Sequence, residues 1–331
     1  MSMNNHIGII LTAFAVVSLS GCGESEPCLK CLEDEELEMN RVTVSVVSSD
    51  VLTRAAEDHE SDVRNVSLYV FSEEGETVNS FSNGTGVFDM YLPSGKYTFR
   101  TFVNCVGLPL NPQSGSDLDE AGVRLSGNGE GGFQMTGSAT EEILQNRAVT
   151  VKVHRLVSKV EWVVHTAFDE FHRDAELVVR AVYLTNVVGG MDFSLKASAR
   201  ADDWYNRMFY AASDVDELLI DRTGFVLSDG DTAVSSKPLY ALPNSVADNR
   251  DKTDWTPRCT RLVVEADYCG DSWYYPVTFP ALAPNTAYVV DLTVKGPGLE
   301  HPEDTVKGTA AVEVRIEVVP WEDGGTIRAE Y

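Results

Sequence analysis

The sequence predicts an all-β protein built from two tandem β-sandwich domains. Many short stretches alternate apolar and polar residues, which is typical of strands with one buried face. Turns rich in Gly, Pro and Asn separate these stretches, and patterns with helical periodicity are scarce. A chain of 331 residues is too long for one typical sandwich, so its length fits two.

The chain begins with a segment that has the features of an exported lipoprotein. Ile7–Ser18 is apolar but shorter than the ~18–20 residues that a spanning helix needs, so residues 1–21 are interpreted as a signal peptide. The sequence Leu19-Ser20-Gly21-Cys22 resembles the lipobox of bacterial lipoproteins. That resemblance implies cleavage between Gly21 and Cys22 and acylation of Cys22, which would anchor the protein in the outer membrane. The alternative is a buried cysteine that follows an apolar helix.

Residues 22–40 are acidic and have almost no apolar periodicity, which predicts a flexible tether. Acidic residues just after a lipidated cysteine resemble the surface-export signals of Bacteroides-type lipoproteins, which would place the body outside the cell. Simple solubility explains the same composition equally well. Cys28 and Cys31 have C-x-x-C spacing but no second pair, so they predict a tether disulfide or two free thiols rather than a redox or zinc site.

Net charge and cysteine content exclude further classes of protein. The formal net charge of −25 disfavours binding to nucleic acid and to anionic lipid surfaces, because both repel an acidic body. Six cysteines are few for an exported chain of this length, so the fold does not depend on a disulfide framework. Cys259 and Cys269 would lie about 30 Å apart along one strand, and we do not expect them to pair.

The first domain is expected over residues 41–157. A capping-box spacing between Ser138 and Glu141 predicts a short helix over Ser138–Asn146, and Asn104–Gly132 is expected to be a polar loop. Strands are expected at Arg41–Val47, Val63–Ser72, Thr77–Ser82, Val87–Leu92, Lys96–Val103 and Val149–Val157.

The second domain is expected over residues 158–331. The β-like stretch Ala148–His165 exceeds the ~10 residues of most strands, so a domain junction is placed near Leu156–Ser158. A short helix is predicted at Asp214–Ile220. Strands are expected at Lys159–Val164, Glu176–Val187, Met191–Ala199, Gly224–Leu227, Leu239–Leu242, Arg261–Tyr268, Trp273–Phe279, Ala287–Lys295 and Ala311–Val319.

Several short motifs, in this order along the chain, resemble the fimbrillin superfamily of Bacteroides-type (type V) pili, and most of all its FimB-type lipoprotein anchor subunits. The resemblance implies two transthyretin-like β-sandwiches on a lipidated N-terminus, other fimbrial subunits as partners, and assembly by strand insertion between subunits. The motifs are the lipobox, Val66-Ser67-Leu68-Tyr69-Val70-Phe71, Leu92-Pro93-Ser94-Gly95-Lys96-Tyr97-Thr98-Phe99, Val153-His154-Arg155-Leu156-Val157-Ser158-Lys159-Val160, Leu242-Pro243-Asn244, Asn285-Thr286-Ala287-Tyr288 and Val318-Val319-Pro320-Trp321.

Two strands are candidates for such exchange. Removal of the strand that carries Val42, Val44 and Val46 would expose backbone groups and an apolar groove that a neighbour's strand could fill. Arg54-Ala55, in the loop after it, resembles the arginine-specific processing site of shaft subunits; an anchor would keep it intact, and an ordinary loop arginine is the alternative. The candidate donor or edge strand is the C-terminal one, whose apolar face comprises Val312, Val314, Ile316 and Val318, although a core-facing strand would have the same pattern.

The sequence offers no support for catalysis or for a cofactor. No serine nucleophile elbow, H-E-x-x-H or Walker A motif occurs, and the calcium-like opening at Asp117 lacks the ligands that positions 121 and 128 should supply. The alternative function is that of a glycan-binding surface lipoprotein. Trp204-Tyr205 and Trp273 with Tyr274-Tyr275 could stack on sugar rings, but adjacent strand residues point to opposite faces, which favours core packing.

Overall fold

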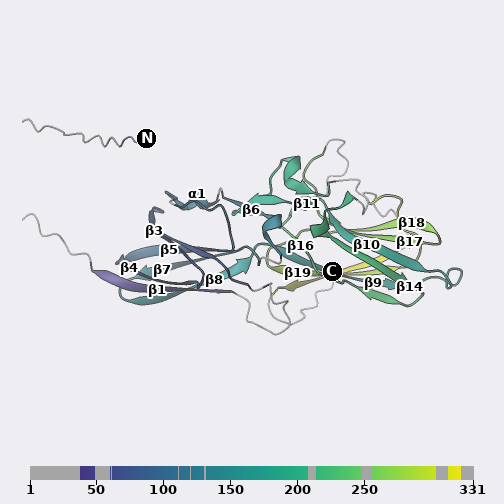
Figure 1. The fold of residues 1–331 in the computed structure, drawn as a ribbon, viewed down its shortest axis with the longest axis horizontal. Coiled ribbons are helices and arrows are strands. Elements are labelled where there is room, and N and C mark those ends of the chain that lie inside the picture. The colour runs from purple at the N-terminus through teal and green to yellow at the C-terminus, as the bar shows by residue number, and fades with distance from the viewer. Residues whose placement is uncertain are drawn as a thin grey trace, which may run out of the picture. The chain divides into compact units, whose positions relative to one another are not determined.

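The computed structural model describes residues 38–48, 60, 62–110, 112–119, 121–129, 132–207, 214–247, 255–302 and 312–321. All of these residues fall within one unit, Glu38–Tyr331. In the described residues the regular secondary structure is mostly β-strand, with only short helices, which confirms the all-β prediction (Figure 1).

Seven of the strands up to residue 155 form one continuous ladder that folds into two faces. Its order is β3-β2-β5-β7-β8-β1-β4. β7 and β8 pair only where Met135 and Thr136 meet Arg155 and His154, so the ladder turns from one face to the other there. The bounds are β1 (Met39–Ser48), β2 (Val66–Phe71), β3 (Thr77–Asn83), β4 (Val87–Pro93), β5 (Gly95–Val103), β7 (Met135–Ile143) and β8 (Arg147–Arg155).

Buried and exposed residues alternate along these strands, and the buried side chains form the core between the two faces. In β8, Val149, Val151 and Val153 are buried while the residues between them are exposed. The same period of two buries alternate residues of β4. Close approach of β7 to β8 needs a glycine, because a Cβ at Gly137 would lie 2.0 Å from the backbone oxygen of Lys152.

Most of the strands from residue 158 onward form two further sheets. One has the order β14-β10-β17-β18, and the other has the order β15-β9-β19-β20 with β16 also paired to β9. β9 and β19 run parallel, whereas the other pairs are antiparallel. The bounds are β9 (Ser158–Thr166), β10 (Leu177–Thr185), β14 (Ile220–Leu227), β15 (Thr232–Val234), β16 (Leu239–Ala241), β17 (Arg261–Tyr268), β18 (Asp271–Thr278), β19 (Thr286–Val294) and β20 (Val312–Pro320).

Short elements connect the two halves of the chain. β6 (Gly122–Arg124) pairs with β12 (Gly190–Asp192), and one hydrophobic core cluster includes residues from both halves. The division into domains at 157/158 stays a prediction. The remaining short elements are α1 (Gly115–Asp119), β11 (Val187–Val188), β13 (Trp204–Tyr205) and the 3₁₀ helices η2 (Leu125–Gly127), η3 (Ala201–Asp203) and η5 (Glu217–Leu219).

Some predicted elements are wrong. The predicted helix Ser138–Asn146 is largely strand β7, because antiparallel pairing with β5 outweighs a local capping pattern. Asn104–Gly132 is not only loop, since α1 and β6 lie within it. β1 begins at Met39, inside the segment predicted as tether, because Met39 and Asn40 pair with Pro93 and Leu92.

Two further corrections concern the second half. The predicted strand Met191–Ala199 stops at Asp192, where Asp192 Oδ1 accepts a hydrogen bond from the Lys196 backbone N–H (3.0 Å) and closes a turn. The predicted helix at Asp214–Ile220 is reduced to η5, whose first turn is capped by the Asp216 side chain.

Candidate functional site

β1 lies between two other strands and is paired along both edges. It runs antiparallel to β4 and parallel to β8. Val42 and Val44 are fully buried and Val46 is partly buried, so the three predicted side chains face the core. They lie beside Met90 and Phe88 of β4. β1 is therefore the central strand of its face although it is the first strand of the described chain.

The space occupied by β1, with β4 on one side and β8 on the other, is here called the β1 seat. Without β1, both neighbouring strands would present a row of unpaired backbone N–H and C=O groups. An apolar strip that includes Phe88 and Val149 would also lose its cover. Each buried valine contributes about 1.5–3 kcal/mol on burial, so an empty seat would bind a matching strand.

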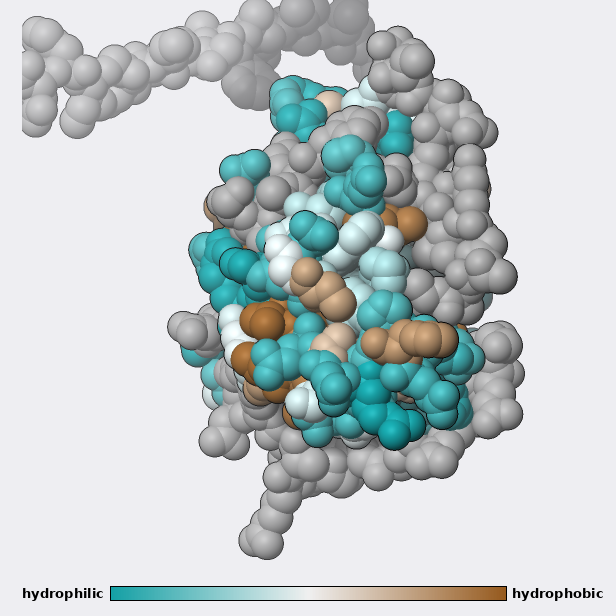
Figure 2. Space-filling model, turned by 90° about the vertical axis from the view of Figure 1, so that its right-hand side faces the viewer, coloured by the Kyte–Doolittle hydropathy of each residue, from teal (hydrophilic) through white to brown (hydrophobic). Residues whose placement is uncertain are grey.

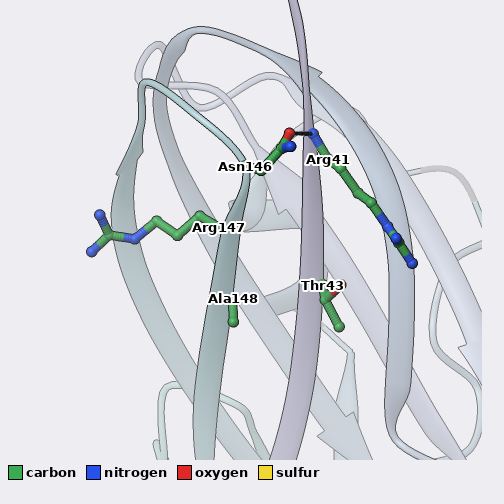
Figure 3. A pocket seen from close by; sticks show the side chains of 5 residues that line it. All are labelled: Arg41, Thr43, Asn146, Arg147 and Ala148. Atoms are coloured by element: carbon green, nitrogen blue, oxygen red, sulfur yellow. Dashed lines mark hydrogen bonds between the residues drawn. The ribbon is translucent and has the colours of Figure 1, made fainter.

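The outer side of the β1 seat is polar. A shallow hollow there is lined by Arg41, Thr43, Asn146, Arg147 and Ala148 (Figure 3). The Arg41 backbone N–H donates to Asn146 Oδ1 at 2.7 Å, and the Arg147 side chain points away from β1. Thr43 donates to Asp89 Oδ1 at 2.6 Å, and this hydrogen bond, together with the Arg41 charge, lowers the pKa of Asp89. These contacts fix the register of β1.

The candidate donor strand, β20, lies at the edge of its sheet. It pairs with β19 only, and among the described strands none pairs with its other edge. Of its predicted apolar face, Val312, Ile316 and Val318 are partly buried against the core and Val314 is 43% exposed. β20 is therefore held by fewer contacts than an internal strand.

The lipidation and processing residues Gly21, Cys22, Arg54 and Ala55 lie outside the described residues, as do Cys28 and Cys31. Their roles remain predictions. Among the described cysteines, no disulfide joins Cys259 to Cys269, as expected.

The aromatic candidates for glycan binding do not form an exposed platform. Trp204 is 5% exposed, donates its indole N–H to Ser198 O at 2.7 Å, and packs edge to face on Trp255. Trp273 is half-buried against the core and Tyr275 is buried. These contacts agree with the core-packing interpretation.

A buried ionic cluster, which the sequence analysis did not identify, joins three distant segments. The Glu60 side chain is 1% exposed. Its Oε1 accepts hydrogen bonds from Lys159 Nζ and Tyr240 OH, each at 2.9 Å. Its Oε2 accepts one from Trp321 Nε1 at 3.2 Å. We call these four residues, with Arg155, the Glu60 cluster.

Arg155 completes the cluster from the end of β8. Its Nε donates to the backbone oxygen of Glu60 at 2.9 Å, and its guanidinium lies 4.5 Å from the centre of a Trp321 ring. The ring of Tyr240 stacks on Trp321 at 5.7 Å with an interplanar angle of 10°. Phe133 packs edge to face on both aromatic rings, so the cluster is enclosed by apolar groups.

The contacts of Glu60 favour its charged form. Burial of the carboxyl raises its pKa, but the hydrogen bond and charge of Lys159, together with the hydrogen bonds from Tyr240 and Trp321, outweigh burial and lower the pKa. The only local signal for this site is an acidic residue next to a loop, which is common on any surface. No sequence pattern could have paired Glu60 with residues so far along the chain.

The described residues offer no site for a metal and no membrane-spanning helix. Within them, no group of three His, Cys, Asp or Glu side chains could hold a metal ion. No helix among them is long and apolar enough to cross a bilayer. Among the coloured residues, the face drawn in Figure 2 is mostly hydrophilic with small, separate hydrophobic spots. That face therefore presents no broad apolar docking surface.

Comparison with known proteins identifies the fold. No family model and no curated protein sequence matches the chain. Among solved structures, a candidate cell adhesion protein from Bacteroides eggerthii superposes with a TM-score of 0.60 at 17% identity, over 86% of this chain and 96% of that one. The chain thus shares its β fold with that protein.

That fold is also the fimbrillin fold. The fimbrilin FimA of Porphyromonas gingivalis superposes with a TM-score of 0.59 at 13% identity, over 86% of this chain and 99% of that one. The tip fimbrial protein Mfa3 of the same species superposes with a TM-score of 0.52 at 13% identity, over 86% of this chain and 100% of that one. The predicted resemblance to fimbrillins is therefore confirmed at the level of the fold.

Proposed function

We propose that this protein is a non-enzymatic fimbrial subunit that joins neighbouring subunits by exchange of a β-strand. The observation that carries the proposal is the position of β1, which is central in its face yet is the first strand of the described chain. A single cut after β1 would free it without interrupting any other strand. The fimbrillin fold supports the same function.

The proposal assigns opposite roles to the two candidate strands. Once β1 is removed, the β1 seat is the receiving groove, because its floor is apolar and its two edges are complete strands. β20 is the donor or edge strand, because no other described strand pairs with its outer edge and its side chains are at most partly buried. Partners are other subunits of a fimbrium, recognised through main-chain pairing and alternate side chains.

We further propose that the protein is the anchor of the fimbrium. In this role Cys22 is acylated and held in the outer membrane, the acidic segment spans to the body, and Arg54-Ala55 stays uncut. An uncut chain keeps β1 in its own seat. Such a subunit therefore ends the polymer, because its own groove is closed to a donor strand.

The test is intact mass and N-terminal sequencing of the protein recovered from cell envelopes. We expect a blocked, acylated Cys22 on a chain that includes Arg54. A new N-terminus at Ala55 would overturn the anchor role and indicate a polymerising shaft or tip subunit. A chain that begins before Cys22, without acylation, would overturn lipid anchoring itself.

A further inference from the structure

The residue after β20 adds a buried anchor to a strand at the edge of its sheet. Among the described strands, β20 pairs with β19 alone, along its whole length, and no residue in it is fully buried. Trp321, which follows directly, is 9% exposed. Its backbone N–H donates to Asn285 O at 3.1 Å, and its indole N–H donates to Glu60. Besides its pairing with β19, β20 is therefore held by the buried contacts of Trp321.

Glu60 is the centre of these contacts. Its carboxylate accepts hydrogen bonds from side chains of β9, β16 and the residue after β20, so one side chain connects these three segments. Water has little access to the carboxylate, and a buried charge that loses partners is costly. Release of Trp321 leaves one oxygen of Glu60 without its donor.

We propose that Glu60 is a latch residue that controls the release of β20 from its sheet. While Glu60 holds Trp321, β20 stays paired with β19; when that hydrogen bond is lost, β20 detaches more readily. The proposal rests on the proposed strand-exchange function and names the regulation of the exchanging strand. Glu60 acts by positioning Trp321 and needs no contact with another subunit.

The latch also couples the two candidate strands. Glu60 follows β1 along the chain, and its backbone oxygen is held by Arg155 at the end of β8, the strand beside β1. A displacement of β1 that moves β8 therefore acts on Glu60 through Arg155. The state of the receiving groove is in this way transmitted to the candidate donor strand.

The test is hydrogen exchange of the isolated full-length protein, measured by mass spectrometry on peptides that cover β20 and, for reference, β17. Glu60→Gln removes the charge and keeps the shape of the side chain. Trp321→Phe keeps an aromatic ring but removes the indole N–H, and it leaves the Glu60–Lys159 ion pair in place. This variant therefore tests the proposal even if Glu60→Gln does not fold. The matched control is Glu217→Gln, which breaks an exposed ion pair with Arg222.

We expect the backbone amides of β20 to exchange about tenfold faster in both latch variants than in the parent. Exchange in β17 should change much less, and the control variant should exchange at the rate of the parent. Unchanged exchange in β20, or equal acceleration in β20 and β17, would overturn the latch. The exchange measurement needs no partner subunit, so it tests the latch separately from fimbrial assembly. If β20 exchanges faster but fimbrial assembly is unaltered, the latch is supported and the role of β20 in assembly is refuted.

Discussion

The indole Nε1 of Trp321 donates a hydrogen bond to Glu60 Oε2 at 3.2 Å, although 261 positions separate the two residues in the sequence. One partner follows the first strand and the other follows the last strand of the described chain. The fold thus brings a residue that follows its first described strand into contact with the residue that follows its last one.

Loss of the Glu60 charge should destabilise the whole fold. Replacement by Gln removes the nearer counter-ion of Lys159, whose side chain is only 14% exposed, and leaves only the more distant carboxylate of Glu161 at 3.8 Å. We expect Glu60→Gln to lower the free energy of unfolding by about 3 kcal/mol, measured by urea denaturation. Glu217→Gln, on the surface, should have little effect. Equal midpoints for the two variants would show that the cluster contributes no stability.

The contribution of Glu60 should depend on pH. Its pKa is lowered on folding, so the unfolded chain takes up the proton first as the pH falls. The stabilisation is complete well above the unfolded pKa of about 4.3 and is lost as the pH falls through the lower folded pKa. The difference in unfolding free energy between the parent and Glu60→Gln should therefore shrink below about pH 4.3. A constant difference from pH 7 to pH 3 would contradict this assignment.

The β1 seat should accept a strand supplied from outside. A chain that begins at Ala55 lacks β1, and we expect it to self-associate because the seat is empty. A peptide with the sequence of Met39–Ser48 should return it to a monomer, measured by light scattering. The same peptide with Val44→Asp is the control, since a carboxylate would enter a fully buried position. Equal rescue by both peptides would argue against an apolar groove.

Gly137 should be essential for the geometry of the β1 seat. A methyl group there would meet the backbone oxygen of Lys152 at 2.0 Å, so Gly137→Ala must push β7 away from β8, the strand that borders β1. We expect the variant to lose at least about 3 kcal/mol of unfolding free energy. At Gly224, where an added Cβ meets nothing within 4 Å, substitution by Ala should change little. A similar result for both variants would contradict the close approach of β7 to β8.

Periodicity predicts the strands well wherever one face meets the core. The expected strand Arg41–Val47 is part of β1, and the expected strand Ala311–Val319 overlaps β20 almost completely. Both have β-branched apolar residues at every second position, and this period of two is typical of a strand with one face toward the core. The predicted helix at Ser138 is wrong because a helix-capping pattern stabilises the chain less than a full set of hydrogen bonds to β5 does.

The site was predictable only in part. Val42 and Val44 were recognisable as a buried strip from alternation alone, but the central place of β1 depends on parallel pairing with β8, which no local pattern encodes. The Glu60 cluster could not be predicted, because its partners come from four separate segments and each residue is ordinary in its own surroundings.

The parallel pairing of β1 with β8 also has a consequence for biogenesis. Arg41 meets Asn146 across 105 residues of sequence, so β1 cannot gain both of its neighbouring strands until the chain as far as β8 has been synthesised. During that interval one edge of this alternating, valine-rich strand lacks its partner β8, and contacts of this sequence separation form slowly. A chaperone that shields this edge would therefore protect the chain from aggregation.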